Sequence, residues 1–123
     1  MGKKMVKSKV GNREVDNISL DELLASREKL FKYGNELIRS KGHDYNHKQQ
    51  QSGDTIYNMR LTQLMGITDT IERGIMVRLS DKLMRLVSLL DTEPKHESVK
   101  DTCVDIINYT SILYTVYAKR HAL

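Results

Sequence analysis

The chain has 123 residues, 39% hydrophobic and 29% charged, which is the size and composition of one soluble domain with a core of its own. It contains no apolar run near the roughly 20 residues that span a bilayer, and no signal-peptide pattern opens it. One cysteine and four histidines give no basis for a zinc site, and Cys103 in an apolar stretch is typical of a reducing compartment. We therefore expect a cytoplasmic protein without a membrane partner.

The net charge of +4 comes from the beginning of the chain. Residues 1–13 carry five basic side chains and no acid, and the rest carries 15 basic and 16 acidic side chains. We therefore divide the chain into a basic N-terminal arm, residues 1–17, and a single helical domain, residues 18–123. Nucleic acid is expected as a partner only through the arm, because the domain itself lacks the positive charge that nucleic-acid binding requires.

The first helix is expected to begin at Leu20, because Ser19 and Glu22 form the pattern of a capping box. Apolar residues continue at helical spacing to Ile38, and Gly42 stands where a helix end is expected. Gly34 lies inside this apolar face and costs about 1 kcal/mol relative to alanine. It predicts the close approach of another helix or of a ligand.

Two further helices are expected before Pro94. A short one covers Thr55 to Leu64 and ends at Gly66. The next helix is expected to begin with a cap pair, Asp69 and Glu72, and to run to about Leu90. Its core stripe is Ile71, Ile75, Leu79, Leu83, Leu86 and Leu90. Strand patterns are nearly absent, so the predicted fold is an all-α bundle of four or five helices.

The last helix begins near Glu97 and is apolar around most of its circumference up to Tyr117. Such a helix is normally buried in a core or between subunits, so we expect it to be the central member of the bundle. One small chain has too little surface to cover all its apolar side chains. We therefore expect a dimer or a larger even oligomer, completed through Ile106, Ile107, Leu113, Tyr114 and Tyr117.

The last two long helices each carry a polar stripe. The first stripe is Arg78, Asp81, Lys82 and Arg85, and the second is Glu97, Asp101, Asp105 and Asn108. The short connection at 91–96 makes the two helices antiparallel neighbours, so the stripes can face each other. Carboxylates bind Mg²⁺ together with phosphate oxygens, and arginine and lysine bind the phosphates themselves. The same pattern is also typical of a structural ladder of ion pairs.

The segments VRLSDKLMRLVSLL and ESVKDTCVDIINYTSIL, with KGHDYN upstream, resemble the nucleotide modification associated domain found largely in bacteriophages. That family is similar in layout to the all-α nucleoside triphosphate pyrophosphohydrolases of the MazG and dimeric dUTPase kind. The resemblance covers about residues 20–117 and is most specific over 77–109. It implies an oligomeric, MazG-like helical bundle that acts on or binds nucleotides in the cytoplasm of the bacterial host.

The resemblance also implies which residues form the site. Nucleotide-binding positions are Asp44, Tyr45, Arg78, Lys82, Arg85 and Asn108, and the candidate Mg²⁺ ligands are Asp81, Glu97, Asp101 and Asp105. Tyr109 also matches the family pattern.

The chain has fewer acids than the MazG pattern, which is EExxE on one helix and ExxD on the next. Here Asp81 stands beside Lys82 on the first helix, and Asp101 and Asp105 are four apart on the second. Three functions therefore stay open. The first is a Mg²⁺-dependent nucleotide hydrolase or nucleotide-modifying factor, which as an enzyme would be a nucleoside triphosphate pyrophosphohydrolase. The second is a non-catalytic protein that sequesters a nucleotide or nucleotide signal, as phage anti-defence proteins do. The third is a structural oligomerisation module.

Overall fold

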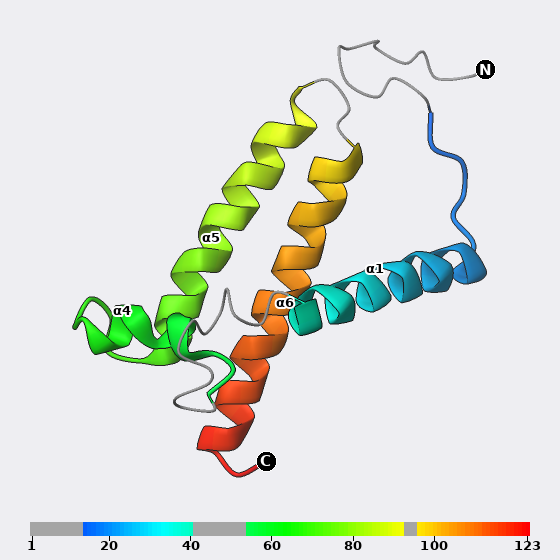
Figure 1. Cartoon of the computed structure of the whole chain (residues 1–123). Coiled ribbons are helices and arrows are strands. Elements are labelled where there is room, and N and C mark those ends of the chain that lie inside the picture. Colours follow the sequence, from blue (N-terminus) through cyan, green and yellow to red (C-terminus); the bar gives the residue numbers. More distant parts are fainter. Residues whose placement is uncertain (1–13, 41–53, 93–95) are drawn as a thin grey trace.

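The computed structural model describes residues 14–40, 54–92 and 96–123, and the regular structure in these ranges is entirely helical. The elements are α1 (Leu20–Ser40), the 3₁₀ helix η1 (Tyr57–Arg60), α4 (Leu61–Leu64), α5 (Ile71–Leu90) and α6 (His96–Arg120) (Figure 1). No strand occurs in the described ranges, so the all-α class is confirmed. None of the described helices is long and apolar enough to cross a membrane.

α5 and α6 form an antiparallel hairpin: Lys82 pairs with Asp105 near the middle of the two helices, and Glu72 in the first turn of α5 pairs with Arg120 at the end of α6. The main buried cluster lies between these helices and η1 and consists of Met59, Ile75, Leu79 and Ile112. α1 packs on another side of α6 (Figure 1). The expected central position of α6 therefore agrees with the structure.

The beginning of α1 is the expected capping box. The Ser19 N–H donates to Glu22 Oε1 at 2.9 Å, and the Glu22 N–H donates to Ser19 Oγ at 3.0 Å. These bonds satisfy donors that the first turn of a helix otherwise leaves unpaired. The predicted end at Gly42 lies outside the described residues, as does the basic arm up to residue 13.

The beginning of α5 differs from the prediction. Thr70 is the N-cap, with an extended backbone and an Oγ1 that accepts a hydrogen bond from the Arg73 N–H at 3.1 Å. Asp69 forms an exposed ion pair with the Arg73 guanidinium instead, at 3.3 Å. The Glu72 carboxylate binds Arg120 of α6. The predicted pair of Asp69 and Glu72 is therefore wrong, because Glu72 has a stronger, charged hydrogen-bond donor on another helix.

The buried face of α5 also differs from the predicted stripe. Ile75 and Leu79 are buried as expected, but Leu83 and Leu90 are 52% and 58% exposed, and Leu89 is buried. The step of four from Leu79 to Leu83 advances about 40° beyond one full turn, whereas Leu89 lies about 80° to the other side of Leu79, so the buried face turns away from Leu83. Leu90 is the last residue of α5. The prediction for Leu83 and Leu90 is therefore wrong, and Leu89 holds the core position at that end of α5.

α1 crosses α6 near its middle, and its N-terminal half extends away from the hairpin (Figure 1). At the crossing, a Cβ added to Gly34 would lie 2.9 Å from Asn108 Oδ1. The close helix approach that Gly34 predicts is therefore confirmed. Beyond the crossing, Leu20, Leu23 and Leu24 are 69%, 51% and 46% exposed. The N-terminal half of α1 therefore has an apolar stripe that the described part of the chain leaves uncovered.

Candidate functional site

A cleft of about 450 Å³ lies where α5, α6 and the C-terminal half of α1 meet. We call it the polar cleft. Its described lining includes Lys82 and Arg85 from α5, Asp101 and Asp105 from α6, and Tyr33 from α1. The structure thus brings together four of the residues predicted from the two polar stripes.

Lys82 and Asp105 form an ion pair across the hairpin, with Nζ 2.9 Å from Oδ2. Their side chains are only 28% and 30% exposed. Lys82 occupies the inward face of α5, between the buried positions Leu79 and Leu89, and therefore points toward α6. Because water screens a half-buried pair less than a surface pair, this contact fixes both side chains more firmly than a typical surface salt bridge.

The second carboxylate of the cleft is held from α1. The Tyr33 hydroxyl donates to Asp101 Oδ1 at 2.9 Å. Lys100 Nζ lies 4.5 Å from the centroid of the Tyr33 ring, which is the geometry of a cation–π contact. Both carboxylates of the cleft therefore already have a partner within the chain, Lys82 for Asp105 and Tyr33 for Asp101.

Arg85 is the remaining cation of the cleft. It lies at the exposed edge of α5, and the described part of the chain offers it no ion pair. Buried Thr102 lines the inner wall of the cleft, and its Oγ1 donates to the Ser98 carbonyl at 2.7 Å. The cleft therefore combines one unpaired guanidinium, one paired ammonium and two carboxylates, so it can accept an anion at Arg85 and exchange partners at Lys82.

Three predicted residues lie elsewhere. The Arg78 guanidinium donates to the Asn58 carbonyl of η1 at 3.4 Å, and Asp81 is exposed outside the cleft lining. Consecutive residues stand about 100° apart around a helix, so Asp81 points away from the direction of Lys82. Asn108 is 3% exposed, and its Nδ2 donates to the Gly34 carbonyl at 3.4 Å. Asn108 therefore joins α1 to α6 instead of lining the cleft.

The other predicted residues cannot be placed in the cleft. Asp44 and Tyr45 lie outside the described residues, and so does the side chain of Glu97. For Mg²⁺, the ion that the resemblance implies, the described cleft offers Asp101 and Asp105. No group of three or more histidine, cysteine or acidic side chains with metal-binding geometry occurs among the described residues. The pair nevertheless fits the usual mode of Mg²⁺, which takes one or two carboxylates and completes its shell with water and phosphate oxygens.

The sequence patterns did not point to four of the described lining residues, namely Tyr33, Leu37, Ser98 and Thr102. Gly34 was the available signal for Tyr33, because a close helix approach at a glycine places its neighbour beside the facing helix. Tyr33 also lines a second groove of about 540 Å³ between α1 and α6. Among the described residues that line this groove, Lys29, Lys32 and Lys100 outnumber Glu36, the sole acid, so it carries a net positive charge.

Comparison with protein-family models, with curated proteins and with solved structures found no match for this chain. The geometry and charge of the polar cleft are therefore the features from which a function can be inferred.

Proposed function

We propose that the protein binds a phosphorylated nucleotide in the polar cleft, as a nucleotide-binding protein of phage nucleotide metabolism with a MazG-like layout. The observation that carries the proposal is the convergence of Lys82 and Arg85 with two carboxylates in one cleft of about 450 Å³. Arginine and lysine are the side chains that form charge-assisted hydrogen bonds with phosphate. The adjoining lysine-lined groove adds positive charge beside Tyr33, which favours an anionic ligand.

Mg²⁺ would enter together with the nucleotide. Asp101 and Asp105 are the residues that would hold it, and the ion would neutralise phosphate charge. Occupation of Asp105 by a cation would release Lys82 from its ion pair. Lys82 would then be free to bind a phosphate oxygen. The pair of Lys82 and Asp105 thus acts as a preformed contact that the ligand replaces.

Binding without turnover is the form of this function that the cleft supports best. Both carboxylates are engaged by the chain's own donors, Tyr33 and Lys82, and Asp81 lies outside the cleft lining. Hydrolysis by a pyrophosphohydrolase mechanism is the second candidate, and it is favoured by the position of Asp101 and Asp105 in one cleft. Asp105→Asn separates the two, because it keeps the shape of the side chain and removes its charge. Loss of turnover with modest loss of affinity indicates an enzyme, and a change in affinity alone indicates sequestration.

Two arginines of α5 provide a matched test of binding. Arg85 lines the cleft, whereas Arg78 binds a backbone carbonyl of η1 and does not line it. We expect Arg85→Gln to weaken nucleotide binding by about 10-fold to 150-fold, the equivalent of one charge-assisted hydrogen bond. Arg78→Gln should leave affinity unchanged. The measurement is a panel of nucleoside mono-, di- and triphosphates by thermal shift and calorimetry, with and without Mg²⁺.

The proposal fails if no nucleotide in the panel raises the melting temperature of the wild-type protein. It also fails if Arg78→Gln and Arg85→Gln weaken binding equally, because the ligand would then not be in the polar cleft. In either case the structural reading, in which the polar stripes are only ion pairs that hold the hairpin, would replace it.

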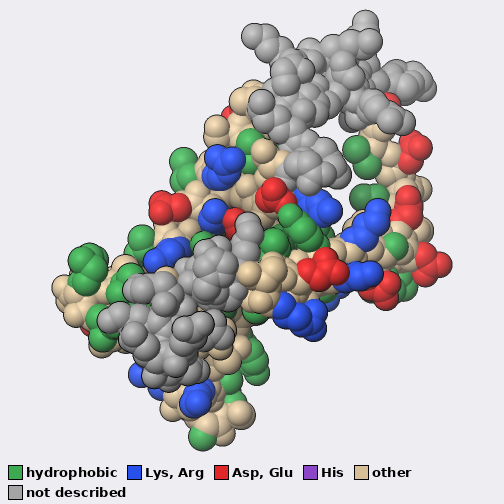
Figure 2. Space-filling model, viewed as in Figure 1, with side chains coloured by type: hydrophobic (Ala, Val, Ile, Leu, Met, Phe, Trp, Pro, Cys, Tyr) green, Lys and Arg blue, Asp and Glu red, His purple; other side chains and the backbone are tan. Residues whose placement is uncertain are grey.

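We also propose that the protein is a homo-oligomer joined through the outer face of α5. Met76, Leu83, Val87 and Leu90 follow steps of seven, four and three residues, which is the spacing of a coiled-coil seam, and each is 52–58% exposed. Figure 2 shows hydrophobic side chains reaching the surface along α5. Such a stripe is self-complementary when two copies meet about a two-fold axis. Of the α6 residues expected at the interface, Ile106 and Leu113 instead pack against the core of the same chain.

The matched test places one charge inside this seam and one outside it. Leu83 and Leu64 are 52% and 58% exposed, but Leu64 belongs to α4 and lies outside the seam. We expect Leu83→Glu to convert the oligomer to a monomer in sedimentation velocity, and Leu64→Glu to leave it assembled. A monomeric wild-type protein at micromolar concentration would contradict the proposal.

A further inference from the structure

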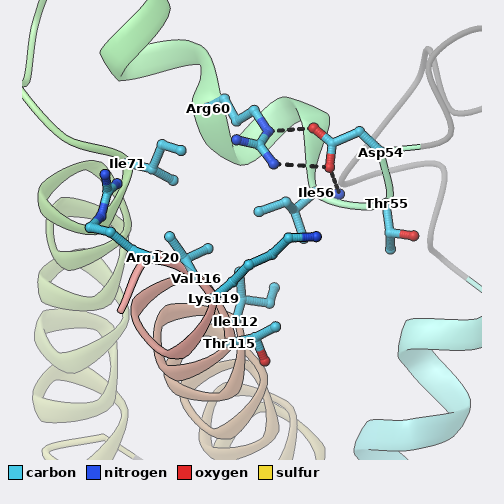
Figure 3. A pocket seen from close by; sticks show the side chains of 10 residues that line it. All are labelled: Asp54, Thr55, Ile56, Arg60, Ile71, Ile112, Thr115, Val116, Lys119 and Arg120. Carbon is cyan, nitrogen blue, oxygen red and sulfur yellow. Dashed lines mark hydrogen bonds and ion pairs between the residues drawn. The ribbon is translucent and has the colours of Figure 1, made fainter. Parts of the chain in front are cut away.

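A second cavity, of about 550 Å³, lies at the other end of the hairpin, between the segment around η1 and the last turns of α6. We call it the apolar pocket, and Figure 3 labels the ten described residues that line it. Its apolar lining consists of Ile56 just before η1, Ile71 of α5, and Ile112 and Val116 of α6. The volume lies within the range of small-molecule sites, roughly 300–1,000 Å³, and such sites combine an apolar body with a few polar groups.

Two of the three cations that line the apolar pocket are neutralised by acids. Arg60 forms an ion pair with Asp54 through Nε, and its Nη2 donates to the second carboxylate oxygen at 3.2 Å. Arg120 makes a bidentate pair with Glu72, with both distances at 2.7 Å. The hydrogen bond from each arginine holds the pKa of its carboxyl partner below the usual range, so both acids stay ionised at neutral pH. Each arginine charge is therefore balanced.

Lys119 is the third cation. It forms no ion pair within the described part of the chain, but it lies close enough to the Asp54 carboxylate to help lower the pKa of that group. Figure 3 shows its side chain extending along the pocket past Val116, with the ammonium directed toward the segment of Ile56 and Thr55. The stem of a lysine can lie on apolar surface while its head stays at the solvent edge. The apolar pocket thus has an apolar floor and the hydroxyls of Thr55 and Thr115 nearby. Its three cations face only the two carboxylates that pair with the arginines, which leaves an excess of one positive charge at the edge of the pocket.

We propose that the apolar pocket binds a small amphipathic monoanion, an aliphatic or aromatic carboxylate whose body covers the isoleucines and Val116 and whose carboxylate pairs with Lys119. One unpaired ammonium matches one negative charge, whereas a nucleotide phosphate brings two or more charges and needs additional cations. The two arginines are unsuited to that task because each is held by a carboxylate in bidentate geometry. The site is separate from the polar cleft, since the described residues that line the one do not line the other.

The test is a series of straight-chain carboxylates from butanoate to octanoate, with the matching alcohols and alkylammonium ions, measured by calorimetry or ligand-observed NMR. Affinity should rise about 4-fold for each added methylene until the pocket is filled. Each carboxylate should bind up to about 5-fold more tightly than the alcohol of the same length, because its partner is a solvent-edge lysine. The alkylammonium ions should bind most weakly.

Two variants assign these effects to the apolar pocket. Lys119→Gln should remove the preference for carboxylate over alcohol while keeping the dependence on chain length. Val116→Phe should fill the pocket and abolish binding of every ligand in the series, with circular dichroism and melting temperature showing that the fold persists. Lys29→Gln, which changes a lysine of the groove between α1 and α6, is the matched control and should behave as wild type.

The proposal is overturned if no compound in the series binds, if alcohols or alkylammonium ions bind as tightly as carboxylates, or if Lys119→Gln keeps the preference for carboxylate. Arg85→Gln should weaken nucleotide binding but leave carboxylate binding unchanged. The two proposals can therefore fail independently of each other. Displacement of a bound carboxylate by a nucleotide would also count against the proposal, because it would mean that the two ligands share one site.

Discussion

The two neighbours of α6 are held to it by different kinds of contact. α5 packs along it through apolar side chains, with Ile75 fully buried and Leu79 and Ile112 nearly so. α1 crosses it at one place, where Gly34 meets Asn108 and where the Tyr33 hydroxyl reaches Asp101. The first interface depends on the burial of several apolar side chains, whereas the second combines a close backbone approach over the fully buried Val104 with two hydrogen bonds.

The two interfaces therefore contribute to the polar cleft in different ways. The hairpin fixes the distance between Lys82 and Asp105 and so sets two walls of the polar cleft. α1 adds the third wall through Tyr33, and Gly34 is the one residue of α1 that is buried. We therefore expect α1 to open before the hairpin does, because local stability follows the density of buried apolar contacts.

The largest expected effect is on the hairpin. Ile75→Ala removes a fully buried side chain from the α5–α6 core, which costs about 2–5 kcal/mol of unfolding free energy. Urea denaturation measures it. Val77→Ala, two positions away at 50% exposure, is the control and should cost far less. Equal losses for the two variants would mean that the hairpin is not organised around this core.

A smaller effect is expected at the α1 crossing. Asn108→Ala removes the hydrogen bond to the Gly34 carbonyl and leaves a buried acceptor with one partner fewer, at a cost of about 1–3 kcal/mol. Amide hydrogen exchange should show faster exchange in α1 and unchanged protection in α5. Thr110→Ala, on the exposed face of α6, is the control. Loss of protection in α5 to the same extent as in α1 would contradict the separation of the two interfaces.

The same distinction explains what the sequence could predict. The capping box of Ser19 and Glu22 is local, and the facing of Lys82 and Asp105 follows from a short connection between antiparallel helices. Both depend on residues close in sequence or on a helix period, and both were predicted. The antiparallel hairpin and the central position of α6 follow from the same kind of information.

The contacts of α1 could not be predicted in the same way. Tyr33 meets Asp101 across 68 positions of sequence, and the angle at which α1 crosses α6 is not set by any short connection. Likewise, Thr70 and Asp69 are neighbours that can both cap a helix. The choice between them involves Glu72, whose carboxylate is held by Arg120, 48 residues away. Local sequence patterns do not predict which hydrogen-bond partner a side chain takes when that partner lies this far away in the chain.

The smallest expected effect concerns the far end of the hairpin and depends on pH. The hydrogen bond from Arg120 is the main cause that holds the pKa of Glu72 below its usual 4.5. The folded protein therefore binds a proton at Glu72 less readily than the unfolded chain does. The stabilisation is complete above about pH 4.5 and is lost as the pH falls through the lowered pKa of the folded state. Glu72→Gln should thus be slightly less stable than wild type at neutral pH, and the difference in stability should shrink as the pH falls below about 4.5. Arg120→Gln removes the same pair from the other side and should give the same profile. A gap that stays constant with pH would show that the pair of Glu72 and Arg120 does not fasten this end of α6 to α5.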